Sequence, residues 1–281
     1  MNFKNAAEAA KDYVVEQRRW FHQHPELSWQ EFKTTDKIEQ ELKKMGYDYV
    51  QTAGTYDYIT PEEFAKYAKD AGIEICGTHY NWDLIRNDVE GTIRYHEILG
   101  TTNVGIGGMP MAARDDIEGL NAFIDEFNRM ARIYHERGFK LTYHNHSFEF
   151  RKIDGKTIMD YLIEGLDPRY TAFVLDSFWA HIGGEDVRAL IERLNGRVAC
   201  VHLKDLDPCY KYELADGTTI SYLPKRVEVG CGNMKFEGII KTAEACGCKY
   251  FTVEDEHYST GESYDTMKIS ADNIKAKFLE K

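Results

Sequence analysis

The run VACVHLKD, residues 198–205, is apolar almost throughout and becomes ionisable at its carboxyl end. The runs AFVLD (172–176) and YFTVED (250–255) repeat this pattern. Strands that are covered on both faces, as in a parallel sheet, read as near-continuous apolar segments. We therefore expect parallel core strands here, each followed by polar side chains where it ends.

Further β-rich runs on either side of these three alternate with helical patterns, which is the rhythm of βαβ units. In the longest helical pattern, Leu120, Phe123 and Phe127 recur at three- and four-residue steps, and Gly138 follows as a stop signal. Thr60, followed by a proline and two glutamates, marks another helix start. The expected strands are 47–52, 73–78, 103–107, 140–144, 172–176, 198–204 and 250–254.

This series fits an α/β fold, either an open doubly wound sheet or most of an eight-stranded (β/α)8 barrel. A dinucleotide-binding sheet shows G-x-G-x-x-G directly after an early strand, and the glycines of VGIGGMP, residues 104–110, lack that spacing. The length of 281 residues also suits a barrel. We therefore predict a TIM barrel, in which the irregular region 206–236 is a long excursion typical of a substrate lid.

The composition argues against several classes of protein. Lys and Arg number 35 against 47 Asp and Glu, and this net charge of −12 disfavours a nucleic acid partner. No apolar run approaches the roughly 20 residues of a membrane span, and the charged start is unlike a signal peptide. We therefore expect a cytoplasmic protein with no membrane partner. The six cysteines contain no CxxC pair, and we expect them to be reduced thiols.

Ionisable side chains follow successive expected strands. His144, Asp176, His202 and Glu254 each end a strand, and the strand ends of a barrel converge at one mouth. Two imidazoles and two carboxylates there suit a divalent ion, Mn²⁺, Zn²⁺ or Mg²⁺, with positions left open for the oxygens of a sugar. Taken singly, each residue has a more ordinary explanation, as a hydrogen-bonded strand-end histidine or a helix-capping aspartate.

Over residues 37–281 the chain resembles the sugar phosphate isomerase/epimerase group of xylose isomerase-like TIM barrels, which also contains inosose dehydratases. The stretches EICGTHY, YHNHSFEF, LDSFWAHIGG, VHLKDL and KYFTVEDE carry the resemblance. In that family the metal is held at the ends of strands five to eight, which implies His144, Asp176, His202 and Glu254 as ligands. Many members have a glutamate at the fifth-strand position, so His144 argues against a proton relay between two glutamates.

The activity that this resemblance implies is the isomerisation or epimerisation of a sugar or sugar phosphate, by proton transfer through an enediolate. We expect Glu254 to act as the base and His144 or Lys204 as the partner acid, although Lys204 has an equal alternative as an ion-pair partner of Asp205. Four further residues are expected to contact the substrate: His79, Asn145, His146 and Trp179.

The first 45 residues lack the apolar strand that opens an intact member of this family, so strand one is missing or replaced by N-terminal helices. Residues 6–24 and 34–45 read as helices. Residues 1–46 resemble the N-terminus of M20 amidohydrolases and peptidases, which indicates a chimera with a helical segment over 1–36. We expect the two unpaired sheet edges to be covered by the N-terminal helix, by a partner chain or by direct pairing of the flanking strands.

Two other functions stay open at this point. A lyase that dehydrates a keto-inositol would use the same metal and base, and the missing strand would also be compatible with a non-catalytic remnant of the fold. In either enzymatic case the partner is a small sugar or polyol. The sequence leaves the oligomeric state open, a homo-oligomer included.

Overall fold

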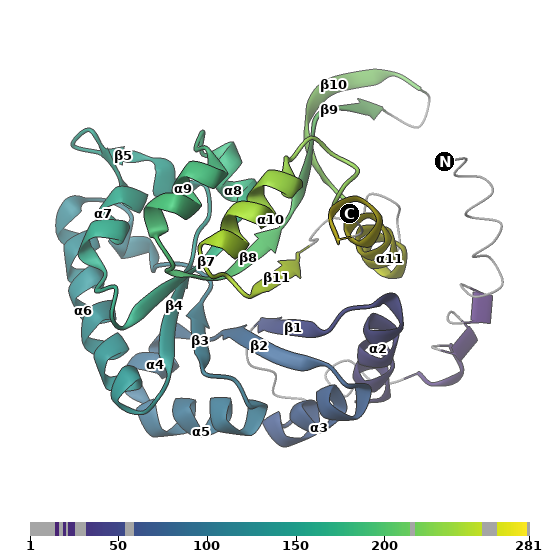
Figure 1. Ribbon diagram of the computed structural model, residues 1–281, viewed down its shortest axis with the longest axis horizontal. Helices are drawn as coiled ribbons and strands as arrows, with labels where there is room; N and C mark the ends of the chain where they lie inside the picture. Colours follow the sequence, from purple (N-terminus) through teal and green to yellow (C-terminus); the bar gives the residue numbers. More distant parts are fainter. Residues whose placement is uncertain are drawn as a thin grey trace.

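The computed structural model describes residues 15–16, 19–20, 22–25, 32–53, 59–213, 217–254 and 263–279. In this part of the chain, parallel strands form an inner layer and helices lie around its outside (Figure 1). The strands curve into a barrel whose wall is incomplete. The α/β alternation expected from the sequence is confirmed.

Within the described ranges, five strands form a continuous parallel sheet in the order β11, β8, β7, β4 and β3, and β1 and β2 form a parallel pair next to β3. The backbone N–H of Tyr80 donates to Gly105 O over 2.7 Å, and a Cβ on Gly105 would collide with Thr78 O, so glycine is required where β2 meets β3. The expected strands are confirmed, with ends shifted by two residues at most. They are β1 (Tyr49–Ala53), β2 (Glu74–His79), β3 (Asn103–Ile106), β4 (Lys140–His144), β7 (Thr171–Asp176), β8 (Val198–Leu203) and β11 (Tyr250–Val253).

Helices cover the outer face of the strands. α3 (Pro61–Ala71) begins with a capping box, in which the side chains of Thr60 and Glu63 each accept a backbone N–H from the other residue. α6 (Ile117–Glu136) buries the apolar stripe that the sequence predicted. The remaining elements are α2 (Phe32–Met45), α4 (Trp82–Asn87), α5 (Val89–Leu99), η1 (Met111–Ala113), η2 (Phe148–Phe150), β5 (Lys152–Ile153), β6 (Lys156–Thr157), α7 (Ile158–Gly165), α8 (Ser177–Ile182), α9 (Val187–Leu194), α10 (Phe236–Ala245), α11 (Ser263–Ile274) and η3 (Lys275–Leu279).

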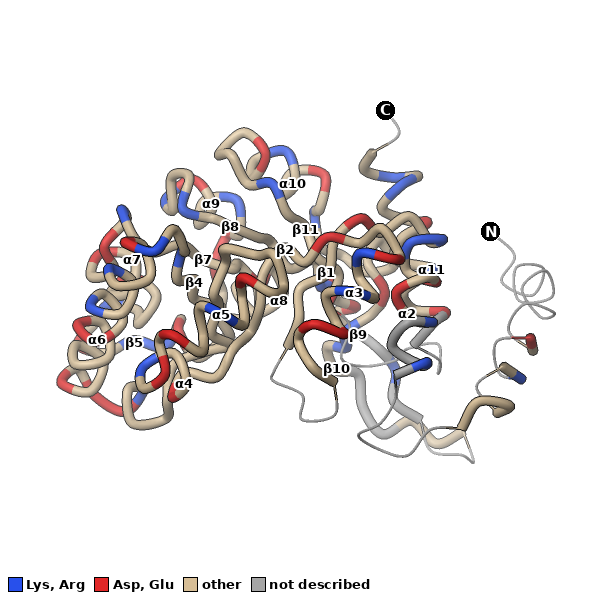
Figure 2. The backbone as a smooth tube through the Cα atoms, turned by 90° about the horizontal axis from the view of Figure 1, so that it is seen from below, with Lys and Arg blue, Asp and Glu red and all other residues tan. Residues whose placement is uncertain are grey.

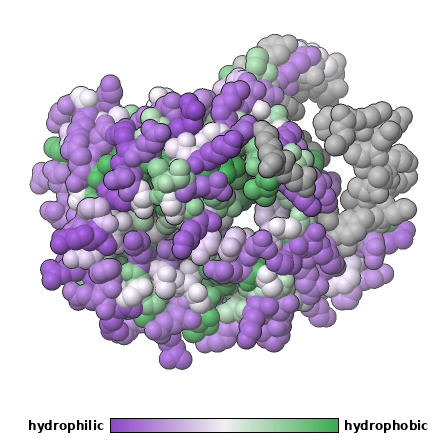
Figure 3. Space-filling view, viewed as in Figure 1, coloured by the Kyte–Doolittle hydropathy of each residue, from purple (hydrophilic) through white to green (hydrophobic). Residues whose placement is uncertain are grey.

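Many of the charged side chains lie on the outside of this layered structure. Lysine, arginine, aspartate and glutamate lie along the outer helices (Figure 2), and hydrophilic residues cover most of the face seen in Figure 3. The core between strands and helices is built from large apolar side chains, of which Phe127, Phe173 and Tyr143 are fully buried. Among the described residues, no helix combines the length and the apolar composition that a membrane span requires.

The excursion between β8 and α10 is an antiparallel hairpin, not the irregular lid that we expected. β9 (Asp205–Glu213) pairs with β10 (Thr219–Val227), and the two project from the barrel (Figure 1). The chain returns to the barrel because the buried Asp205 carboxylate accepts backbone N–H groups from Gly230 (2.8 Å), Gly232 (2.9 Å) and Met234 (3.0 Å). Pro208 and Pro224 interrupt both strands, and this hid the strand pattern in the sequence.

The N-terminal expectations are only partly covered by the described residues. Helix α2 confirms the helix expected over 34–45. The helix expected over 6–24, and with it most of the segment 1–36, lies largely outside the described residues.

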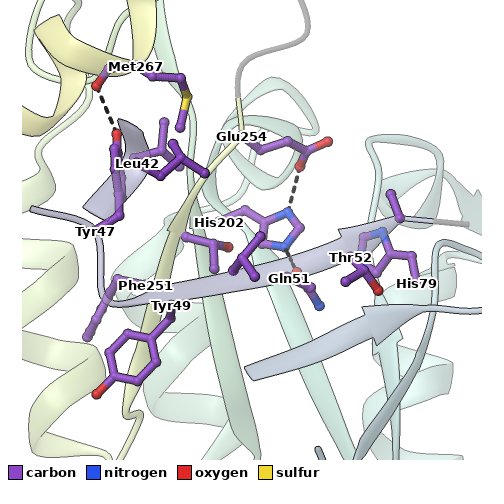
Figure 4. A pocket seen from close by; sticks show the side chains of 14 residues that line it. Leu42, Tyr47, Tyr49, Gln51, Thr52, His79, His202, Phe251, Glu254 and Met267 are labelled. Carbon is purple, nitrogen blue, oxygen red and sulfur yellow. Dashed lines mark hydrogen bonds and ion pairs between the residues drawn. The ribbon is translucent and has the colours of Figure 1, made fainter. Parts of the chain in front are cut away.

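The barrel wall is open between β1 and β11, where strand one was expected to be missing. No backbone hydrogen bond joins these two strands within the described ranges. The rings of Tyr49 and Tyr250 meet edge to face at 5.0 Å across the opening. Helices α2 and α11 pack together beside it, where Tyr47 Oη donates to Met267 O over 2.9 Å (Figure 4). Direct pairing of the flanking strands is therefore not the way in which this wall is covered.

Because one edge of β1 lacks a ladder, we predict that the amides of residues 49–53 exchange with solvent at least about tenfold faster than those of residues 198–202 in β8, which is paired on both sides. Native-state hydrogen exchange measured by NMR tests this. Equal protection of the two segments would show that the edge of β1 is paired in solution.

A second prediction concerns His96, which is fully buried in α5. Its Nε2 lies 2.8 Å from Thr78 Oγ1 and its Nδ1 lies 2.7 Å from Thr92 O, and burial lowers the pKa of His96 to about 4. The unfolded chain, with a histidine pKa near 6.5, binds more protons between these values, so the free energy of unfolding falls as the pH drops from 6.5 towards 4. We expect a loss of about 3 kcal/mol from this residue.

Urea denaturation between pH 6.5 and 4.5 measures this loss. The variant His96→Gln, which cannot take up a proton, should be less stable at pH 7 and show a shallower pH dependence, by about one proton. An unchanged slope in the variant would contradict the assignment to His96.

Candidate metal centre

The side chains that end four neighbouring strands meet at the mouth of the barrel. His144 (β4), Asp176 (β7), His202 (β8) and Glu254 (directly after β11) each offer one atom, and these atoms all lie within 4.8 Å of one another. Thr252 and Asp176 both align with His202 in the parallel ladder, so the register of β11, β8 and β7 brings their ends level. The ligand set expected from the sequence is thus brought together in one place.

The distances between these atoms are close to those of a metal site. His144 Nε2 lies 3.6 Å from Asp176 Oδ2 and 3.9 Å from Glu254 Oε2, whereas His202 Nδ1 lies 4.0 Å from Asp176 Oδ2 and 2.6 Å from Glu254 Oε2. Ligand atoms about 2.1 Å from one cation can be at most about 4.2 Å apart. A small rearrangement, in which His202 Nδ1 and Glu254 Oε2 move apart and the wider pairs approach, is therefore enough for a single ion to contact all four.

Two buried polar atoms of the cluster have no hydrogen-bond partner among the described residues. They are His144 Nε2 and Asp176 Oδ2, which lie 3.6 Å apart, and Asp176 Oδ2 also forms an ion pair with Lys204 Nζ at 3.2 Å. An unsatisfied buried polar atom costs about 1–3 kcal/mol, so such a pair needs an explanation. Imidazole and carboxylate donors around one point fit a divalent cation, which would bond to both.

The electrostatic state of the cluster also favours a cation. Burial by itself raises the pKa of the Asp176 carboxyl, but the neighbouring His144, Lys204 and His202 outweigh it and hold the pKa below its ordinary value. Burial also raises the pKa of the Glu254 carboxyl. The hydrogen bond from His202, together with the nearby Lys204 and His144, outweighs this effect, so the pKa of Glu254 lies below its ordinary value. Both carboxylates are therefore ionised at neutral pH, and a single ammonium, that of Lys204, faces both.

Asp176 is held rigidly. It is fully buried and caps α8, with Oδ1 accepting the backbone N–H of Trp179 over 2.8 Å. The side-chain amide of Asn145 accepts Asp176 N–H at Oδ1 (2.9 Å) and donates from Nδ2 to Asp176 O (3.3 Å). Asn145, which we expected to contact the substrate, uses both polar atoms of its side chain to position Asp176 in this structure.

Lys204 lies between the two carboxylates. Its Nζ is 3.2 Å from Asp176 Oδ2 and 3.3 Å from Glu254 Oε1, and the side chain is almost completely buried. The alternative ion pair between Lys204 and Asp205 is not formed here, because the Asp205 carboxylate accepts hydrogen bonds from the backbone N–H groups that follow the hairpin. Lys204 is thus placed beside the expected base, Glu254.

The other expected substrate residues surround the cluster. The His79 ring lies 4.7 Å from His144 and 5.4 Å from His202, and its buried Nε2 has no hydrogen-bond partner in the described part of the chain. Burial and the two neighbouring imidazoles hold the pKa of His79 well below its usual range. The His146 ring lies 4.9 Å from His144 and 5.8 Å from Trp179, whose ring also faces Lys204 Nζ at 5.4 Å.

Three residues near the site were not predicted from the sequence. Gln51 on β1 contacts His202, and the Arg226 guanidinium of the hairpin lies 5.3 Å from the Trp179 ring. Glu149 is the third, because the chain turns after Asn145 and Glu149 accepts hydrogen bonds from Tyr143 Oη (2.6 Å) and from His146 N (2.8 Å). Burial raises the pKa of Glu149 to about 7. The alternation of β1 was the only sequence signal for Gln51.

The opening in the barrel wall leads to this cluster. A cavity of about 140 Å³ lies between β1 and β11 and is lined by residues of both strands, together with His79, His202 and Glu254 (Figure 4). Thr52 Oγ1, another buried atom without a partner among the described residues, lies on the same cavity. A small polyhydroxylated molecule would find unsatisfied polar groups and the candidate metal ligands side by side here.

Known proteins with related sequences and structures share this architecture. The family model for the xylose isomerase-like TIM barrel matches residues 40–277. An inosose dehydratase of Geobacillus kaustophilus is 34% identical over 180 residues, which are 62% of this chain and 46% of the relative. The chain thus spans less than half the length of that curated relative.

Solved structures agree on the fold. A sugar phosphate isomerase/epimerase from Parabacteroides distasonis superposes with a TM-score of 0.70 at 23% identity, covering 87% of this chain and 93% of the other. The IOLI protein with a bound zinc atom gives a TM-score of 0.60 at 16% identity, covering 85% and 91%. The expected resemblance of residues 1–46 to M20 amidohydrolases gains no support from any of these similarities.

If the cluster binds a divalent cation, the purified protein should bind Mn²⁺, Zn²⁺ or Co²⁺ in the micromolar range or tighter. We expect Asp176→Ala to weaken binding at least about 100-fold, because it removes an ionised ligand from a buried site. Isothermal titration calorimetry on metal-stripped protein measures both. Asp125→Ala, at an exposed position on α6, is the matched control and should bind like the wild type. Equal affinities for the Asp176 and Asp125 variants would remove Asp176 from the ligand set.

Proposed function

The chain belongs to the xylose isomerase-like TIM barrel family, and we propose that it is a metal-dependent sugar isomerase or epimerase that moves a proton beside a carbonyl group. The observation that carries this proposal is the buried cluster in which His144 Nε2 and Asp176 Oδ2 lack partners and Lys204 lies between two carboxylates. Side chains that could hold a metal ion and groups able to carry a proton lie within a few ångströms of one another, which supports the proposal.

A divalent cation held by His144, Asp176, His202 and Glu254 would polarise the carbonyl and the adjacent hydroxyl of a ketose. Glu254 is ionised and lies at the cavity, so we assign it the removal of the proton from the carbon beside the carbonyl. Lys204 Nζ, 3.3 Å from Glu254 Oε1, then supplies or holds the proton at the carbonyl oxygen as the enediolate forms. Return of the carbon-bound proton to the neighbouring carbon gives isomerisation, and its return to the other face of the same carbon gives epimerisation.

The remaining residues bind and orient the substrate in this proposal. His79 Nε2 and Thr52 Oγ1 offer unsatisfied hydrogen-bonding atoms on the cavity, and both suit hydroxyl groups. His146 and Trp179 form the opposite side of the mouth, where the indole ring provides a flat surface for a sugar. His144 stands where many relatives carry a glutamate, so the proton relay of this chain runs between Glu254 and Lys204.

A dehydratase is the second candidate, and the similarity to an inosose dehydratase favours it. The same first step removes a proton beside the carbonyl of a keto-inositol. The hydroxyl group on the next carbon then leaves as water, taking its proton from Lys204, and a carbon–carbon double bond forms. The third possibility, a non-catalytic remnant, predicts that the cluster holds no metal.

The test is proton exchange in deuterated water. We expect the metal-loaded protein to incorporate deuterium beside the carbonyl of at least one member of a panel of ketopentoses, ketohexoses, their phosphates and keto-inositols, as followed by NMR. Product analysis separates the candidates, because an isomerase gives a new sugar whereas a dehydratase gives an unsaturated ketone. Absence of exchange across the whole panel in protein with bound metal would contradict the proposed chemistry.

Variants of the proton-carrying groups sharpen this test. Lys204→Met should keep metal binding, because the ammonium is not a ligand, and should lower the exchange rate by about 10²–10⁴. Glu254→Gln should weaken metal binding and also lower the exchange rate. Lys241→Met, at an exposed position on α10, is the control and should change neither. An exchange rate in Lys204→Met equal to that of the wild type would exclude Lys204 as the acid.

A further inference from the structure

Gln51 is the residue of β1 that reaches the cluster. Its side-chain Oε1 lies 2.5 Å from His202 Nε2, and this contact joins residues 151 positions apart in the sequence (Figure 4). The other ring nitrogen of His202, Nδ1, faces Glu254 Oε2 at 2.6 Å. His202 is itself buried in β8, so its ring has a fixed environment on both sides.

The contact with Gln51 fixes a hydrogen on one nitrogen of the His202 ring. An amide oxygen only accepts hydrogen bonds, so the Nε2 that approaches Gln51 Oε1 must carry a hydrogen. A histidine that binds a metal offers the lone pair of one nitrogen, and here that nitrogen can only be Nδ1. Nδ1 faces the cluster, and a cation bound there would replace the hydrogen bond that Nδ1 shares with Glu254 Oε2.

We propose that Gln51 is the positioning residue for His202: its side-chain oxygen accepts the Nε2–H and thereby presents the Nδ1 lone pair to the cation. Partners of this kind on the second nitrogen of a metal-binding histidine orient the ring and strengthen the ligand. The inference rests on the proposed function, because it requires a cation at the cluster.

The backbone of β1 is irregular at the residue that makes this contact. The parallel register between β1 and β2 shifts between Val50 and Gln51, so that Val50 aligns with Ile75 and Gln51 aligns with Gly77. Irregularities of this type redirect a side chain and are common beside active sites. Gly77 carries no side chain, and the amide of Gln51 lies over it, since a Cβ there would be 3.6 Å from Gln51 Nε2.

The same hydrogen bond crosses the opening in the barrel wall. β1 is paired with β2 but has no ladder to β11 in the described ranges, so the Gln51–His202 bond links β1 to β8 in the continuous sheet across the opening. A cation that immobilises His202 would therefore also restrain β1. Through Gln51, metal binding at the cluster and the ordering of β1 at the opening would each favour the other.

Two substitutions separate this role from a general structural one. Gln51→Leu removes the acceptor at similar size, whereas Gln51→Glu keeps an oxygen that can accept Nε2–H. We expect Gln51→Leu to weaken Co²⁺ binding about 10–100-fold, and Gln51→Glu to stay within about threefold of the wild type. Gln40→Leu, at an exposed position on α2, is the matched control.

Co²⁺ titration by calorimetry gives the affinities, and the visible absorption of the bound Co²⁺ reports the ligand geometry, which should change in Gln51→Leu alone. Hydrogen exchange of residues 49–53 adds a second readout. Co²⁺ should slow this exchange in the wild type and in Gln51→Glu but leave it unchanged in Gln51→Leu. Circular dichroism confirms that each variant is folded.

The inference is overturned if Gln51→Leu binds Co²⁺ as tightly as the wild type, or if Gln51→Glu loses as much affinity as Gln51→Leu. In both cases the wild type still binds metal, so the proposed function survives. Failure of the wild-type protein itself to bind Co²⁺, Mn²⁺ or Zn²⁺ would instead remove the proposed function and this inference together.

Discussion

The centre of this molecule is constrained by charge. Asp176 and Glu254 are both ionised, lie inside one cluster, and share the buried ammonium of Lys204. Burying two carboxylates is costly in a low-dielectric environment, and among the described residues Lys204, His144 and His202 offset that cost. The orphaned Nε2 of His144 and Oδ2 of Asp176 mark the place where a divalent ion would remove that cost. The rest of the site, from the capping of α8 to the amide of Asn145, holds these groups in place.

The open barrel wall does not disturb this centre, because of where the opening lies. The four candidate ligands come from β4, β7, β8 and the end of β11, which belong to one unbroken parallel sheet. The opening falls at the edge of that sheet, between β11 and β1. In the described part of the chain, the wall is open at this edge, the geometry of the candidate ligands is intact, and a cavity of about 140 Å³ reaches them from the side. β1 still contributes, through the contact between Gln51 and His202.

Strands and ligands were predictable from the sequence for the same reason. Strands covered on both faces are recognisable as apolar runs, and in a parallel barrel their carboxyl ends meet, so His144, Asp176, His202 and Glu254 could be grouped without coordinates. The hairpin of β9 and β10 was missed because its prolines break the pattern and it projects away from the core. The contacts of Gln51, Asn145 and Glu149 could not be predicted, because they depend on long-range packing and on a turn that local sequence does not encode.

The central claim is that one divalent cation binds at the meeting point of these strands. Anomalous diffraction from crystals of the Zn²⁺- or Mn²⁺-loaded protein tests it most directly. We predict one strong anomalous peak about 2.0–2.3 Å from the side chains of His144, Asp176, His202 and Glu254. Crystals grown with saturating metal that show no peak at this cluster, or one bound elsewhere, would contradict the account.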